Sequence, residues 1–168
     1  MLESLPPADP LTVSSLAEKF VPRFSLLHPW RRYLLKGGVE AVASLLQPGE
    51  NVLLMAFAKI GVHPALIAVA GLAYLDILEP LFLKPHIVAL TDRRLLLIQL
   101  SIWDYRAKRL RLAAPREALS VVRAKETWFY FSAWVRQHNG EILRFNFPYS
   151  GWEMEGRSLV GGLGYPPK

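Results

Sequence analysis

The first part of the chain places its apolar residues at helical spacing. Residues 10–20 and 39–47 each present apolar side chains on one side of a helix. Asp9 precedes the first segment and is suited to cap it, because its carboxylate accepts hydrogen bonds from the first free N–H groups of a helix. Gly37-Gly38 is expected to separate the second helix from the chain before it, since glycine weakens helices. The pattern predicts two short helices ahead of the main domain.

After residue 50 the pattern changes to short runs of β-branched, aromatic and alternating apolar residues. About seven strands are expected, over residues 52–58, 87–90, 94–100, 107–113, 120–125, 127–137 and 141–147. His138-Asn139-Gly140 is a strong hairpin signal. A last helix is expected over residues 152–163. Closely spaced strands joined by hairpins predict an antiparallel barrel or sandwich.

The most apolar part of the chain, residues 60–83, lies between the first two expected strands. A helix that begins at Pro64 and ends or kinks at Pro80 fits this segment. Asp76 and Glu79 weaken a membrane-spanning reading, because a carboxylate near a helix centre costs about 2.5–3.5 kcal/mol and each Leu or Ile returns only about 0.3–0.6 kcal/mol. Three placements remain open: inserted in a membrane, buried against another element, or packed against a second copy.

Three stretches of the chain carry a resemblance to a known family. The first reads LQPGENVL at residues 46–53, and the second reads VALTDRRLLL at residues 88–97. The third is the late hairpin of residues 139–145. Together they resemble the bacterial pleckstrin-homology-like (PH-like) domains, a group related in fold to the PH and GRAM domains.

The resemblance covers about residues 45–163 and implies an α+β, mainly β fold. In that fold a bent, antiparallel, seven-stranded barrel is closed at one end by a C-terminal helix. The expected organisation is an N-terminal helical extension over residues 1–44 and a PH-like domain over 45–168, with the apolar insert at about 60–83. Many members of the group have no assigned activity. Strand alternation predicts one core built from Leu90, Leu95, Leu97, Phe129, Phe131, Leu143, Phe145 and Trp152.

Positive charge is concentrated in one stretch. Nine basic residues against three acidic ones fall between Asp92 and Lys125, so this stretch alone accounts for the net charge of +6. A local excess of this kind suits an anionic lipid surface. The alternatives are a solvated sheet face and, at the turn itself, arginines that pair with Asp92. The candidate residues for an anionic surface are Arg93, Arg94, Arg106, Lys108, Arg109, Arg111 and Arg123.

Apolar and aromatic residues supply a second candidate contact. Trp and Tyr side chains beside Arg favour the interfacial layer of a membrane, although the same residues could pack on the domain itself. The candidate membrane or partner contacts are Trp30, Arg31, Arg32, Tyr33, Leu66, Ile67, Leu72 and Leu75. We therefore expect a non-catalytic module that associates with an anionic membrane surface or lipid. The alternative is a protein–protein adaptor or a homo-oligomer that uses the insert as its interface.

Other chemistry is poorly represented in the sequence. The chain has no cysteine, and its four histidines are not at metal-ligand spacing. Nucleophile-elbow, phosphate-loop and zinc-protease motifs are absent. We expect no enzyme activity, no metal and no cofactor. The aromatic run around Trp134 is typical of a barrel core rather than a base-stacking surface, so nucleic acid is not expected. The N-terminus lacks the pattern of a secretory signal, which predicts a cytoplasmic protein, able to sit at the inner face of the membrane.

Overall fold

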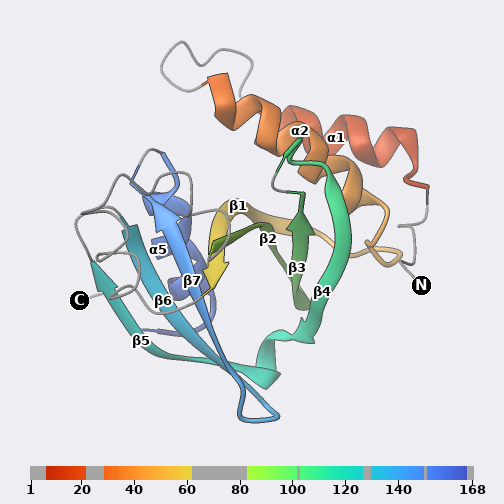
Figure 1. The fold of residues 1–168 in the computed structure, drawn as a ribbon. Coiled ribbons are helices and arrows are strands. Elements are labelled where there is room, and N and C mark those ends of the chain that lie inside the picture. Colours follow the sequence, from red (N-terminus) through yellow and green to blue (C-terminus); the bar gives the residue numbers. More distant parts are fainter. Residues whose placement is uncertain are drawn as a thin grey trace.

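The fold is α+β and mainly β. The computed structural model describes residues 7–21, 29–61, 83–101, 103–126, 130–149 and 151–165. Its elements, coloured along the chain in Figure 1, are α1 (Pro10–Phe20), α2 (Pro29–Ala43), β1 (Val52–Gly61), β2 (Leu83–Thr91), β3 (Arg94–Leu100), β4 (Ala107–Pro115), the short 3-10 turn η2 (Arg116–Ala118), β5 (Leu119–Glu126), β6 (Tyr130–Gln137), β7 (Ile142–Pro148) and α5 (Glu153–Gly162). The strands form one antiparallel, seven-stranded sheet in the order β4-β3-β2-β1-β7-β6-β5.

The first helix confirms its sequence signal, whereas the bounds predicted for the second are wrong. Asp9 caps α1, because its Oδ2 accepts a hydrogen bond from the Thr12 N–H at 2.9 Å. The second helix begins at Pro29 rather than at residue 39, and it passes through Gly37 and Gly38. A Cβ at Gly38 would lie 2.7 Å from Cγ1 of Ile87, so the glycine allows α2 to pack closely on β2. This packing outweighs the intrinsic cost of glycine in a helix.

The sheet has two halves that meet at a short junction. Strands β1 to β4 form one meander and β5 to β7 form another, as Figure 1 shows. Among the described residues, the strands of the two halves pair through Lys59 with Asn146 and Ile60 with Phe145. The rest of β1 in the described structure pairs with β2, and the sheet curves around its inner face.

The paired strands leave a shorter apolar insert than the sequence predicts. The strand predicted to end at Ala58 continues to Gly61, and Gly61 pairs with Leu83 at the start of β2. The insert therefore leaves the end of one hairpin strand and returns to its neighbour. Residues 62–82, and with them the predicted helix and the four predicted contacts of the insert, lie outside the described residues.

Most of the predicted core is confirmed on the inner face of the sheet. Leu90, Leu95, Leu97, Phe131, Phe145 and Trp152 are buried, and Leu143 packs against them partly buried. Phe129 lies outside the described residues. Helix α5 covers this face closely, since a Cβ at Gly156 would lie 2.6 Å from Phe147. Each large apolar side chain buried here contributes about 1.5–3 kcal/mol to stability.

The two faces of the sheet are covered by different helices. Alternate residues of a strand point to opposite faces. Ile87 of β2 meets α2, whereas Leu90 of the same strand meets Gly162 at the end of α5. Helix α2 contacts β1, β2, β3 and β4, so the first meander has its outer face covered. Helix α5 packs on the inner face of β6 and β7 and leaves their outer face to other contacts.

Candidate functional site

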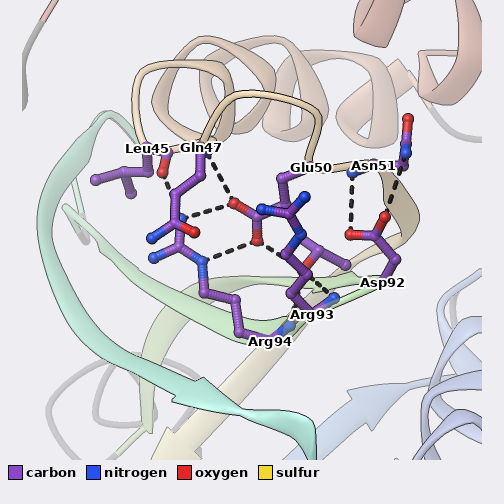
Figure 2. Close-up of polar contacts among 8 residues, drawn as sticks. Leu45, Gln47, Glu50, Asn51, Asp92, Arg93 and Arg94 are labelled. Atoms are coloured by element: carbon purple, nitrogen blue, oxygen red, sulfur yellow. Dashed lines mark hydrogen bonds and ion pairs between the residues drawn. The ribbon is translucent and has the colours of Figure 1, made fainter.

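The two longest stretches that carry the family resemblance contact each other. Glu50 is buried, and its Oε1 accepts hydrogen bonds from Thr91 Oγ1 at 2.7 Å and Arg94 Nε at 2.8 Å. Its Oε2 accepts from Arg94 Nη2 and from the Gln47 N–H, both at 2.8 Å. Figure 2 shows these contacts. We call Gln47, Glu50, Thr91 and Arg94 the Glu50 clasp.

The clasp holds a charged carboxylate inside the fold. Burial raises the pKa of Glu50, but hydrogen bonds from Arg94, Gln47 and Thr91 outweigh it and bring the pKa down to about 2. Arg94 Nη2 also donates to the carbonyl of Leu45 at 2.7 Å. The side chain of Arg94 is 18% exposed, so it joins β3 to the segment before β1 rather than facing a ligand.

The predicted pairing of the turn arginines with Asp92 is wrong for Arg94. Asp92 instead accepts hydrogen bonds from the N–H of Asn51 at 3.1 Å and from its Nδ2 at 3.2 Å. These bonds lower the pKa of Asp92. Arg93 is exposed and, within the described part of the chain, forms no ion pair. The turn therefore has a structural role, because its hydrogen bonds connect the β2–β3 hairpin to the start of β1.

A pocket of about 520 Å³ opens on the inner face of the sheet. It lies between the far end of the β1–β2 hairpin, the middle of β3 and β4, and the β6–β7 hairpin. Its lining residues are Ile60, Gly61, Lys84, His86, Leu97, Arg111, Leu112, Gln137, Glu141 and Leu143. The floor is apolar and the rim is polar, a combination that suits ligand binding. We call this hollow the inner pocket.

An irregularity in β4 brings one of the predicted cations, Arg111, to the inner pocket. The sequence predicts that Arg109 and Arg111 face away from Leu110 and Leu112 by simple alternation. The register instead shifts between Leu112 and Leu110, which leaves Arg111 as an extra residue in the strand. Arg111 and Leu112 consequently line the same pocket. Arg109 lies one step further along β4, where its Nε donates to Oε1 of Gln99 at 3.0 Å.

His86 is the buried titratable group of this site. It is 3% exposed, and its Nδ1 lies 2.8 Å from the carbonyl oxygen of Lys84. A carbonyl oxygen only accepts, so Nδ1 carries the proton and Nε2 is left as an acceptor. Burial is the main cause that lowers the pKa of His86 to about 4; the bond to the Lys84 carbonyl opposes this shift, and the charges of Arg111, Lys84 and Arg109 add to it. The ring is therefore neutral near pH 7.

The electrostatics of the inner pocket favour an anion. Lys84 and Arg111 stand at its rim with Arg109 nearby, and Glu141 is the single acid among the lining residues. Among the described residues neither Lys84 nor Arg111 forms an ion pair. Cations that outnumber the acids in a partly apolar hollow attract an anionic group.

A larger hollow of about 980 Å³ lies between α1, α2 and the loop before β4. Its lining includes Glu40, Asp104 and Arg106, so charges of both signs meet there. Arg106 forms an exposed ion pair with Asp104 at 3.5 Å. The mixed charge makes this hollow a weaker candidate for an anionic ligand than the inner pocket.

The seven predicted cations do not form one surface. Arg111 lines the inner pocket and Arg109 lies on the same strand beside it, Lys108 is exposed on β4, and Arg123 lies on β5. Strands β4 and β5 are the two ends of the strand order, as Figure 1 shows. The candidate residues at 30–33 belong to α2, but their side chains lie outside what the structure describes.

Sequence reasoning missed the polar row beside the inner pocket. His86 pairs with Gln99 across β2 and β3, and Gln99 pairs with Arg109 across β3 and β4. The available signal was a single polar residue inside each of two apolar strands, because a buried polar side chain needs a partner. Lys84 was missed because it lies between the insert predicted at about 60–83 and the strand predicted over 87–90, whereas β2 begins at Leu83.

Several absences can be stated for the described residues. No group of three or more His, Cys, Asp or Glu side chains in them is placed to hold a metal ion. Within the same residues, every helix is too short or too polar to cross a membrane. Searches of protein-family models, curated proteins and solved structures give no significant match to this chain.

Proposed function

We propose that the protein is a non-catalytic PH-like module that docks on an anionic phospholipid surface and takes a headgroup phosphate in the inner pocket. The proposal rests on one observation: the ends of the apolar insert and the cations of the inner pocket lie at the same place in the fold. The apolar segment 62–82 is joined to the described fold at Gly61 and Leu83, which pair with each other, and Gly61 and Lys84 line the cation-bearing pocket. Cations and an apolar segment at one site are the two features that bind a protein to an anionic membrane.

The PH-like assignment is part of this proposal. It is supported by the two-part curved sheet, by the C-terminal helix on the inner face, and by the contact between residues 46–53 and 88–97 in the Glu50 clasp. Each cation close to an anionic surface contributes about 1 kcal/mol, so Lys84, Arg109 and Arg111 together supply weak attraction. Stable docking then needs the apolar residues of the insert as a second contribution.

Co-sedimentation with vesicles tests the proposal. The protein should pellet with phosphatidylcholine vesicles that contain phosphatidylserine or a phosphoinositide, and salt should release it. Arg111→Glu combined with Lys84→Glu should abolish pelleting, whereas Arg136→Glu together with Arg123→Glu makes the same charge change on the outer face and should retain most of it. Failure of the natural protein to bind any anionic vesicle at low salt refutes the proposal.

A protein partner is the second candidate function. Two exposed apolar residues, Leu11 at 81% and Trp103 at 89%, are sequence neighbours of Pro10 and Asp104, which line the larger hollow between α1, α2 and the loop before β4. Exposed aromatic residues beside a hollow are common where proteins dock. A discrete oligomer on a sizing column without detergent, lost on Trp103→Ser, favours this adaptor function.

A further inference from the structure

The outer face of β5, β6 and β7 carries a cluster of cations that the proposed function does not use. Strand register places Arg123 beside Trp134 and Trp134 beside Arg144, in one row across the three strands. Lys125 lies beside Ser132 in the next row, and Arg136 lies two residues beyond Trp134 on the same face. Arg123, Lys125 and Arg136 are exposed. We call Arg123, Lys125, Trp134 and Arg144 the outer cluster.

These cations have no acidic counterpart in their own strands. Strands β6 and β7 contain no Asp or Glu, and the single acid of β5 is Glu126. Glu126 forms an ion pair with Arg157 of α5 instead. Among the described residues none of Arg123, Lys125 and Arg144 is in an ion pair. The cluster therefore presents uncompensated positive charge.

Both arginines of the outer cluster contact the ring of Trp134. The guanidinium carbon of Arg144 lies 4.6 Å from the ring centroid of Trp134, and that of Arg123 lies 5.2 Å from it. Each contact is a cation–π interaction, which stabilises a cation over an indole ring. The guanidiniums reach the ring from the strands on either side. Arg123 and Arg144 carry like charges, and the charge of Arg123 lowers the pKa of Arg144, so an anionic group beside them would stabilise the arrangement.

A buried polar chain fixes the position of Arg144. Its Nη2 donates to Ser132 Oγ at 3.1 Å, and Ser132 donates to Oδ1 of Asn146 at 2.9 Å. Asn146 Nδ2 then donates to the carbonyl of Lys59 at 3.0 Å. Ser132 is 0% exposed and Asn146 is 1% exposed. Buried Ser and Asn with all these bonds hold the guanidinium in one orientation, as supporting groups do at binding sites.

One hydrogen-bond donor of Arg144 nevertheless has no acceptor among the described residues. Its Nε is buried and has no hydrogen-bond partner among the described residues. Burial lowers the pKa of Arg144, and the neighbouring charge of Arg123 lowers it further. A half-buried cation that has a free donor and lies beside a second cation lowers stability. A bound anion would remove this cost by accepting the hydrogen bond and balancing the charge.

We propose that the outer cluster binds a phosphate group of a soluble ligand. Arg presents paired donors that match phosphate oxygens, and Trp134 keeps the two guanidiniums oriented. A phosphate monoester carries a charge of about −1.5 to −2 near neutral pH and has three acceptor oxygens. This matches three cations without an acid better than the single charge of a carboxylate does. The outer cluster and the inner pocket lie on opposite faces of the sheet, so the two sites act independently.

Titration of the full chain with inorganic phosphate at constant ionic strength tests the inference. The Arg144 Nε–H and Trp134 indole signals in ¹H–¹⁵N NMR spectra should shift and saturate. Arg144→Gln and Arg123→Gln should each weaken binding about tenfold or more, since each removes charge-assisted hydrogen bonds. Arg136→Gln removes the same charge from the same face and should change the affinity less than about threefold.

Ser132→Ala separates a built site from a simple charged patch. The variant keeps every cation but releases the Arg144 guanidinium, so phosphate affinity should fall several-fold while nearby charge is constant. Shifts that rise linearly without saturation overturn the inference, as do equal losses in Arg136→Gln and Arg144→Gln. Saturable shifts confined to His86 and Arg111 also overturn it, because they place the phosphate in the inner pocket.

Two further arms identify the source of the phosphate. A short oligothymidylate that binds far more tightly than inorganic phosphate, with a steep salt dependence, marks a nucleic-acid surface and overturns the small-ligand inference. Vesicle binding should be unchanged in Arg144→Gln, and its loss there overturns the separation of the two sites. Absence of vesicle binding in the natural protein refutes the proposed function alone, because phosphate titration of the outer cluster does not depend on it.

Discussion

Replacing Arg94 with Met removes the guanidinium from the Glu50 clasp and keeps most of the aliphatic side chain. The carboxylate of Glu50 has a side-chain exposure of 0% and loses its donors at Arg94 Nε and Nη2. Breaking a buried ion pair from one side costs about 3–5 kcal/mol. Thr91 and Gln47 still donate to Glu50, so we expect the lower end, about 3 kcal/mol, out of a domain stability of about 5–15 kcal/mol.

Urea unfolding followed by circular dichroism measures this loss, and a double-mutant cycle isolates the pair. Arg94→Met with Glu50→Gln should be less destabilised than the sum of the single variants by about 1–3 kcal/mol, because no buried charge is left unpaired. A loss below about 1 kcal/mol in Arg94→Met, or strict additivity in the cycle, refutes the clasp as a stabilising unit.

The acid limb of the stability curve gives an independent check on the clasp. The folded protein holds the pKa of Glu50 at about 2, below its ordinary value of 4.5. The clasp therefore contributes stability that is complete above pH 4.5 and is lost as the pH falls toward 2. Arg94→Met should flatten this part of the curve. If Arg94 instead served a membrane surface, its replacement would reduce vesicle binding and leave the acid limb intact.

Two further predictions concern buried positions. The pKa of His86 is lowered from 6.5 to about 4, so protonating the buried ring opposes folding, and the fold should be about 3 kcal/mol less stable at pH 4 than above pH 6.5. His86→Gln should remove that slope from urea unfolding between these pH values, and an unchanged slope contradicts the assignment. Gly156→Ala should cost about 1–3 kcal/mol in thermal unfolding, because its Cβ would lie 2.6 Å from Phe147. Gly161→Ala in the same helix meets nothing within 4 Å and should be neutral or stabilising by up to about 1 kcal/mol. Equal effects of the two changes would falsify this account of α5 packing.

Local signals were sufficient for the elements whose causes are local. Asp9 caps α1 as its sequence position predicts. Gly140 adopts a φ of +85° in the predicted β6–β7 hairpin, a conformation that glycine enters without strain. Alternation along the strands identified most of the inner core, because a strand with one buried face must repeat every second residue. Each of these features depends on neighbours in the chain and can be predicted from them.

Where local preference and packing disagree, the tertiary structure decided the outcome. Gly37 and Gly38 are poor helix residues, yet α2 passes through both, and at Gly38 only glycine allows the close contact with Ile87. Simple alternation misplaced Arg111, because the shift in β4 depends on how β3 and β4 twist against each other. A pattern of single residues carries no information about such contacts.

The two candidate sites show the same division. From the sequence alone the positive charge between Asp92 and Lys125 is evident, and so is its suitability for an anionic partner. The sequence does not show which of those charges lie together. The order of strands in the sheet brings Lys84 to Arg111, and it brings Arg144 to Arg123. Strand order depends on pairing between segments far apart in the chain. Composition and periodicity determined which residues form strands, helices and core, and long-range packing decided which charges became neighbours.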